Sequence, residues 1–227
     1  MKPFLVLIFG PPGSGKSTQA ENVAKKFDAV HVDTGELLRR ILHDPARQHD
    51  PKIREERIKH ETDGQLNDSL WVGGIVNDEL RKLATDGKSV ASSGFPRTIF
   101  EAEIELPVMR GLFGERIFAF ILRVGEETSL FRNSRRRICT KCHKPHLWSE
   151  ETKNIEFCAG CGAALTTRPD DKPDVIKKRL DVYKKRTLPL FNYFESRGLK
   201  LAEVDGELAP EAVFDSIQSK LSEALPQ

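Results

Sequence analysis

Short, continuous hydrophobic runs alternate with amphipathic stretches along most of the chain. The first run, FLVLIF at residues 4–9, ends in glycines and prolines, which is the pattern of a strand buried on both faces of a parallel sheet. Similar runs predict strands at residues 30–32, 89–92, 117–122 and 199–204, and helical periodicity predicts helices at residues 17–27, 69–84, 98–110 and 126–136. Because parallel strands need crossover helices, the pattern predicts an α/β fold, a doubly wound parallel sheet of about five strands with helices on both faces.

Two stretches interrupt this alternation. Residues 37–67 are polar and helical without a strand, and residues 139–165 are rich in glycine, lysine and cysteine and lack a long apolar periodicity. Both are expected to be insertions into one core domain. Ligands of open α/β sheets bind beyond the carboxyl ends of the strands, so the insertions are expected to lie there.

Composition narrows the class of protein. The 227 residues carry 36 Lys+Arg and 34 Asp+Glu, a net charge of +2, which disfavours a dedicated nucleic-acid binder. The longest apolar runs are six residues, far short of the ~20 needed to span a membrane. No small-residue cleavage site follows the first run, so a cytoplasmic protein without membrane partners is expected.

Residues 10–17, GPPGSGKS, match the phosphate-binding motif G-x-x-x-x-G-K-[ST] between a predicted strand and a predicted helix. This context disfavours the alternative, a glycine-proline turn that merely opens a helix. The glycines let backbone N–H groups converge on phosphates, Lys16 reaches the outer phosphates, and the Ser17 hydroxyl can bind Mg²⁺. The loop therefore predicts ATP binding by Gly13, Ser14, Gly15, Lys16, Ser17 and Thr18.

The four cysteines of the chain form two pairs, Cys139/Cys142 and Cys158/Cys161, with fifteen residues between the pairs. This spacing predicts a closed, structural zinc site that folds an insertion lacking an apolar core. The alternatives are a redox dithiol pair, two disulfides, or a Cys₃His site with His143 or His146, although four cysteines already satisfy the ion.

Several further motifs occur in order along the chain: DTGELLR at 33–39, GQL at 64–66, GFPRT at 94–98, Arg132 with Arg136 and Arg137, TRPDD at 167–171, KRL at 178–180 and VDG at 204–206. Over essentially the whole chain they resemble the adenylate kinases, a family with a core, a helical monophosphate-binding insertion and a lid, which carries zinc in a subset of members. The resemblance implies core segments at 1–33, 68–135 and 172–227, a monophosphate-binding insertion at 34–67 and a zinc lid at 136–171.

The resemblance also assigns residues. It implies that phosphoryl transfer depends on Lys16, Arg97, Arg136, Arg168 and Arg179, and that Arg132, Arg136 and Gly206 join the loop in binding ATP. It implies AMP binding by Thr34, Gly35, Arg39, Gln65, Leu66, Asn67, Gly94, Arg97, Glu101, Arg168 and Arg179. Arginine suits these roles because its planar guanidinium binds phosphate oxygens in pairs and keeps its charge. For Arg132 and Arg137 the alternative is a solvated face or compensation of a helix dipole.

The chain departs from the family pattern at a metal-binding carboxylate. The family normally has an aspartate before Gly94 that holds Mg²⁺ through water, and an acidic residue is common at the end of the next strand; here Ser93 and Arg123 occupy these positions. Asp33 stands where the family often has a small hydroxyl residue and is a candidate replacement. The alternative is that Asp33 merely caps the helix beginning near Thr34.

A second departure concerns base recognition. Glu101 replaces a glutamine that reads the adenine of AMP, and a carboxylate matches the two donors of guanine better than adenine N1. The alternative is that Glu101 turns to solvent or pairs with an arginine.

The leading prediction is a monomeric adenylate kinase that uses Mg²⁺ with ATP and phosphorylates AMP. A kinase for another monophosphate, GMP first, and a nucleotide-binding protein with little turnover are the alternatives. A zinc-ribbon nucleic-acid binder is disfavoured by the charge balance and by only two Trp and two Tyr.

Overall fold

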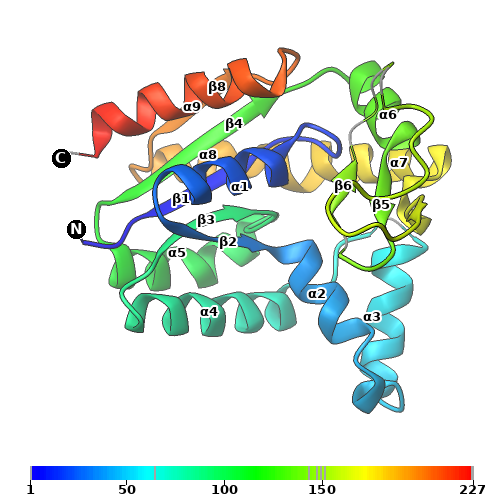
Figure 1. The fold of residues 1–227 in the computed structure, drawn as a ribbon. Coiled ribbons are helices and arrows are strands. Elements are labelled where there is room, and N and C mark those ends of the chain that lie inside the picture. Colours follow the sequence, from blue (N-terminus) through cyan, green and yellow to red (C-terminus); the bar gives the residue numbers. More distant parts are fainter. Residues whose placement is uncertain are drawn as a thin grey trace.

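A parallel sheet forms the core. The computed structural model describes residues 2–63, 65–142, 144–146, 148, 150 and 152–225, so Gly64 of the GQL motif and His143 lie outside the described residues. Among these residues, five parallel strands are arranged in the order β2-β3-β1-β4-β8 (Figure 1). Their bounds are β1 (Leu5–Phe9), β2 (Ala29–Asp33), β3 (Ser89–Ser93), β4 (Ile117–Arg123) and β8 (Leu201–Asp205). The predicted sheet is confirmed.

Helices cover both faces of the sheet, and the alternation of β1 side chains explains why. Leu5, Leu7 and Phe9 belong to a core shared with α4 (Ser69–Thr85), α5 (Ile99–Phe113) and α8 (Leu188–Ser196). Val6 and Ile8 point to the other face and pack with α1 (Lys16–Lys26) and α9 (Pro210–Ala224). Each fully buried side chain contributes roughly 1.5–3 kcal/mol, so β1 has no polar face and its sequence is a continuous apolar run.

The first insertion is helical in its described residues, as predicted. It consists of α2 (Thr34–Leu42), a 3₁₀ turn (Pro45–Arg47) and α3 (Pro51–Glu61), and it projects away from the sheet (Figure 1). Asp33 caps α2 by accepting a hydrogen bond from the backbone N–H of Glu36 at 2.9 Å.

The second insertion follows α6 (Glu126–Arg135) and contains a small antiparallel sheet that the sequence pattern did not predict. Its strands, in the order β6-β5-β7, are β5 (Arg137–Cys139), β6 (Pro145–His146) and β7 (Leu165–Thr166). A 3₁₀ turn (Pro169–Asp171) then contacts α3 and leads into α7 (Pro173–Val182), which continues through a π-helical turn (Tyr183–Thr187) into α8. None of the helices in the described part of the chain has the length and apolarity that crossing a membrane requires.

Candidate active site

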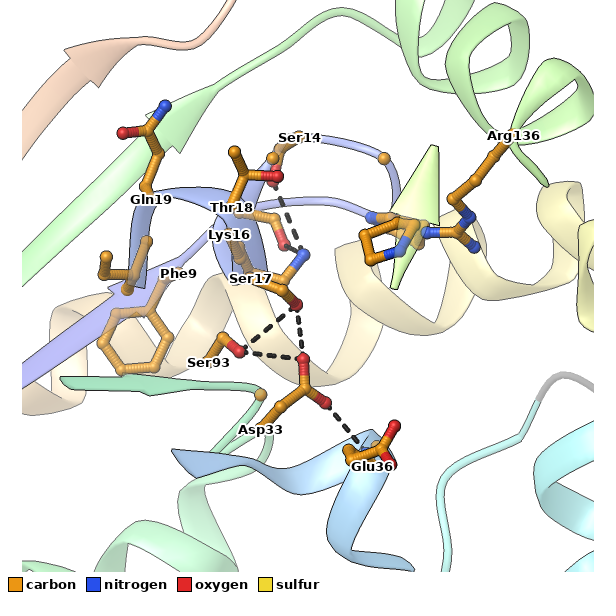
Figure 2. Close-up of a pocket in the computed structure, with 18 of the residues that line it drawn as sticks. Phe9, Ser14, Lys16, Ser17, Thr18, Gln19, Asp33, Glu36, Ser93 and Arg136 are labelled. Carbon is orange, nitrogen blue, oxygen red and sulfur yellow. Dashed lines mark hydrogen bonds between the residues drawn. The ribbon is translucent and has the colours of Figure 1, made fainter. Parts of the chain in front are cut away.

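A cleft of about 760 Å³ opens at the carboxyl ends of the strands and is lined by the core and both insertions (Figure 2). A side cavity of about 20 Å³ adjoins it. Together the two hollows are lined by all the nucleotide-binding residues predicted from the sequence. The residues that line the cleft are Gly13, Ser14, Gly15, Lys16, Ser17, Thr18, Gly35, Arg39, Gln65, Leu66, Gly94, Arg97, Arg132, Arg136, Arg168, Arg179 and Gly206. The side cavity is lined by Thr34, Asn67 and Glu101. Gln65, Leu66, Gly94 and Arg97 line both the side cavity and the cleft.

The loop between β1 and α1 is built to accept an anion. Lys16 Nζ donates hydrogen bonds to the carbonyl oxygens of Gly10 at 2.9 Å and Pro11 at 2.7 Å, which holds the side chain across the loop. Gly13 has a φ of +75°, and a Cβ there would lie 2.4 Å from Asn133 Nδ2, so a larger residue cannot occupy this turn. No described side chain caps α1, which leaves its first N–H groups available to phosphate oxygens.

Lys16 shares the cleft with other cations. Burial, followed by the charges of Arg97 and Arg179, holds the pKa of Lys16 well below its ordinary value. A polyanionic ligand would relieve this repulsion and raise the Lys16 pKa again. The cleft therefore has the electrostatics of a site for a polyanionic ligand.

Asp33 lies beneath the loop, at the end of β2, where it joins Ser17 and Ser93 (Figure 2). Its Oδ2 accepts hydrogen bonds from the Ser17 hydroxyl and, at 3.1 Å, from the Ser93 hydroxyl, while Oδ1 caps α2. Burial favours the neutral acid, but the hydrogen bonds from Ser17 and Glu36 hold the Asp33 pKa at about 2. The capping role is confirmed, and it occupies only one of the two carboxylate oxygens.

The predicted arginines converge on the cleft, and two of them are held by aspartates of the TRPDD motif. Arg136 Nε donates to Asp171 Oδ2 at 2.9 Å, and Arg179 Nη1 donates to Asp170 Oδ2 at 2.8 Å. Arg168 differs, because its Nε is buried without a hydrogen-bond partner among the described residues. Burial and the nearby charge of Arg136 lower the Arg168 pKa to about 10. Arg168 lines the cleft, and an unpaired guanidinium donor beside a cleft is suited to an anionic ligand.

The side chains of two other arginines donate hydrogen bonds to backbone carbonyl groups. Arg132 lines the cleft and donates to the Gly206 carbonyl oxygen at 2.8 Å. Arg137 donates to the carbonyl oxygens of Thr152 at 3.0 Å and Lys153 at 2.7 Å, within the second insertion. Both side chains are half-buried, and of the two only Arg132 is among the residues that line the cleft. Arg123, at the end of β4, forms an exposed ion pair with Glu203.

Glu101 forms part of the side-cavity wall and is only 2% exposed. Its Oε2 accepts from the backbone N–H of Arg97 at 2.7 Å, and its Oε1 accepts from the Ser69 hydroxyl at 2.9 Å. The expectation that Glu101 could turn to solvent is wrong, because Thr98 caps α5 and directs its first turn inward. Burial raises the Glu101 pKa.

One turn along α5, Glu105 is fully buried, and neither carboxylate oxygen has a hydrogen-bond partner in the described part of the chain. Burial, reinforced by the charge of Glu101, raises its pKa well above the ordinary value of 4.5. The folded state then holds a proton that the unfolded state releases, so stability falls as pH rises from 4.5 towards the folded-state pKa. We expect Glu105→Leu to raise the free energy of unfolding at pH 7 by about 1–3 kcal/mol.

Denaturant unfolding between pH 4 and pH 8 tests this expectation. The stability of Glu105→Leu should depend less on pH than that of the parent, and Glu105→Gln, which removes the charge but keeps a polar amide, should show the same flattening with a smaller gain. A parallel shift of the whole pH profile would contradict the assignment to Glu105.

The four cysteines meet in the second insertion. Their sulfur atoms all lie within 4.8 Å of one another, with Cys139 and Cys161 Sγ 3.3 Å apart and Cys142 and Cys158 Sγ 3.7 Å apart. They are free thiols, not disulfides. Among the described residues the cluster consists of the four cysteines, and His146, the ligand of the alternative Cys₃His site, is not part of it. Four thiolates at these separations fit a tetrahedral ion, so this group could hold a metal.

Some residues of the site were not predicted from the sequence. His60, Phe131 and Trp148 also line the cleft, and Asp170 and Asp171 pair with its arginines. The TRPDD motif contained the aspartates, but nothing local in the sequence signals that His60 faces the cleft, because α3 is polar on all sides and shows no apolar stripe.

The fold and the site define a P-loop nucleotide-binding protein whose arginine-rich cleft lies between two insertions. A family model described as adenylate kinase matches residues 8–199. Relatives named adenylate kinase include those of Clostridium botulinum (strain Loch Maree / Type A3), 34% identical over 217 residues covering 95% of this chain and 97% of that protein, and of Kosmotoga olearia, 35% identical over 218 residues covering 95% and 98%. The relative from Methanothrix thermoacetophila is 34% identical over 217 residues, covering 96% and 98%. The chain therefore belongs to the adenylate kinase family and is a phosphotransferase.

Proposed function

We propose that the protein transfers a phosphoryl group reversibly from ATP to AMP and so forms two molecules of ADP. The observation that carries this proposal is a single cleft with a P-loop at one end, a small side cavity lined by Thr34 and Glu101 adjoining it, and a wall rich in arginines, among them Arg39, Arg97, Arg136, Arg168 and Arg179. The family and the names of its relatives support the same reaction.

Positioning and charge neutralisation account for the proposed chemistry, because phosphoryl transfer needs little covalent help. Lys16 and the N-terminus of α1 would hold the donor phosphates. Arg97, next to the side cavity, would hold the phosphate of AMP so that one of its oxygens attacks the terminal phosphorus of ATP in line with the departing ADP oxygen. Arg136, Arg168 and Arg179 would neutralise the charge that spreads over the transferring group.

We also propose the division of the chain into a core (1–33, 68–135 and 172–227), a monophosphate-binding insertion (34–67) and a lid (136–171). Both insertions contribute residues to the cleft wall, and the turn that ends the lid contacts α3. Closure of these two parts would exclude water, which otherwise competes with AMP for the phosphoryl group. One chain supplies the whole cleft, which supports a monomer.

Two metal sites fit the residues present. The Ser17 hydroxyl and the Asp33 carboxylate, whose two oxygens accept hydrogen bonds from Ser17, Ser93 and Glu36, offer the oxygen ligands that Mg²⁺ prefers, directly or through water. When bound with ATP, Mg²⁺ would neutralise charge on the phosphates. Cys139, Cys142, Cys158 and Cys161 suit Zn²⁺, whose role would be structural because four thiolates leave no open position.

Loss of one buried thiolate should remove the lid metal. We expect Cys158→Ser to reduce the zinc content from about one ion per chain to near zero and to melt the lid at a lower temperature, because metal binding supplies its folding energy. Metal analysis by mass spectrometry and calorimetry measure both effects. Lys141→Ser, an exposed change in the same loop, is the control and should retain the metal.

The decisive experiment measures transfer from Mg-ATP to AMP, GMP, CMP and UMP, with each diphosphate detected directly. Rapid transfer to AMP is expected. Transfer to GMP alone would favour the second candidate, for which the buried Glu101 carboxylate is the specific observation because guanine offers it two donors. Tight ATP binding without transfer to any monophosphate would contradict both.

A further inference from the structure

A buried carboxylate organises the end of the first insertion. Glu56, on α3, has a side chain that is 0% exposed. Its Oε2 accepts hydrogen bonds from Asn67 Nδ2 at 2.8 Å and from the backbone N–H of Asp68 at 2.9 Å, and Lys59 donates to Oε1 at 2.9 Å. Burial favours the neutral acid, but the hydrogen bonds from Asn67 and Asp68 hold the Glu56 pKa at about 2. Glu56 is therefore an ionised acceptor.

Glu56 fixes the orientation of the Asn67 amide. Asn67 Nδ2 donates both to the Glu56 carboxylate and to the Glu56 backbone carbonyl oxygen, each at 2.8 Å. Neither oxygen has a hydrogen to donate, so the NH₂ group must face Glu56 and the amide oxygen must face away. Asn67 Oδ1 lies 3.0 Å from His60 Nδ1.

This orientation determines the protonation of His60. Because Asn67 Oδ1 only accepts, the hydrogen between the two atoms belongs to Nδ1 of the imidazole. Burial, followed by the charges of Arg97 and Arg39, lowers the His60 pKa to about 4, so the ring is neutral at pH 7. A neutral ring with hydrogen on Nδ1 carries a lone pair on Nε2.

The lone pair has no protein donor in the described chain, where the one hydrogen bond of the His60 ring is that of Nδ1. His60 lines both the main cleft and the side cavity, and the wall of the side cavity also contains Arg97 and Asn67. We infer that His60 Nε2 accepts a hydrogen bond from the nucleotide that receives the phosphoryl group, and that Glu56 and Asn67 are positioning residues that keep it an acceptor. The donor is an N–H or O–H of AMP, either the 6-amino group or a ribose hydroxyl. The inference rests on the proposed function.

The tautomer is measurable without any nucleotide. Long-range ¹H–¹⁵N correlation spectra of the intact protein distinguish a protonated imidazole nitrogen from one with a lone pair. We expect His60 to show hydrogen on Nδ1 and a lone pair on Nε2, and we expect Asn67→Leu to abolish this preference. Hydrogen on Nε2 in the parent protein would overturn the inference.

Kinetics test the contact itself. We expect His60→Leu to raise the KM for AMP about tenfold, the loss of one hydrogen bond, with kcat and the KM for ATP within about twofold of the parent. His60→Gln, whose amide oxygen can replace Nε2, should recover most of the affinity. The matched control is His43→Leu, because His43 belongs to the same insertion, is exposed and pairs with Glu61 away from the cleft. An unchanged KM for AMP in His60→Leu, or an equal rise for ATP, would overturn the inference.

Analogues of AMP identify the donor. Purine riboside 5′-monophosphate lacks the 6-amino group, and 2′-deoxy-AMP and 3′-deoxy-AMP lack one hydroxyl each. The analogue without the bonded donor should bind the parent about tenfold more weakly than AMP and should lose nothing further with His60→Leu. If all three analogues lose affinity further on this substitution, the contact is not to these donors and the inference fails. Absence of transfer to AMP by the parent would instead overturn the proposed function.

Discussion

Replacing Arg168 with methionine is expected to lower kcat for phosphoryl transfer by about 100- to 1,000-fold, the effect of removing one preorganised charge from a transition state. It should also raise the free energy of unfolding by about 1–3 kcal/mol, because Arg168 Nε is buried without a partner in the described chain. Arg136 and Arg179 would not show this second effect, since aspartates already bind them. Steady-state kinetics and denaturant unfolding measure the two effects.

Arg116 provides a matched control at the opposite end of the sheet. Its Nε and Nη2 are also buried without partners in the described chain, but it precedes β4 at the amino end, away from the cleft. Arg116→Met should stabilise the protein to a similar extent and leave kcat unchanged. If both variants gain stability and keep full activity, Arg168 does not bind the transferring group. If Arg168→Met loses stability, the buried guanidinium has a protein partner.

The parts of the fold that were predictable are those in which burial dictates the residue type. Phe4 to Phe9 are all at most 3% exposed, so every position is apolar and the strand is unmistakable. The lid strands have no such signal, because β6 and β7 contain two residues each and the segment is held by thiols instead of an apolar core. A period-two pattern cannot be recognised over two residues.

The site was predictable where its residues are adjacent in the chain and less so where they meet through the fold. The P-loop is one local motif, and its geometry follows from its glycines. The environment of Glu101 depends instead on Ser69 and on the turn at Arg97, and the role of His60 depends on Glu56 and Asn67. The His60 network is set by the packing of α3 against the segment before α4, and the Glu101 contacts by the packing of α5 against α4, which no single-residue preference reveals.

The second large effect concerns Asp33 and Ser93, which lie on neighbouring strands. Compared with the family pattern, the aspartate and the small hydroxyl residue have changed places between these two positions. Asp33 of β2 and Ser93 of β3 are register partners, and their side chains meet beside Ser17. A carboxylate placed on either strand therefore faces the same hydroxyl group. This geometry explains how the chain could lack the usual aspartate before Gly94 and still provide an ionised oxygen for the hydration shell of Mg²⁺.

We expect Asp33→Asn to lower kcat by about 100-fold and to weaken Mn²⁺ binding in the presence of ATP, because the amide keeps the α2 cap but removes the charge. The double variant Asp33→Ser/Ser93→Asp moves the carboxylate to the partner strand and should recover kcat to within about tenfold of the parent. Electron paramagnetic resonance of Mn²⁺ provides a measure independent of turnover. If Asp33→Asn leaves the rate and the metal dependence unchanged, Asp33 only caps α2. If Asp33→Asn is impaired and the double variant is not rescued, the carboxylate is needed on β2 itself, and the two strand positions are not equivalent despite their shared hydrogen bonds.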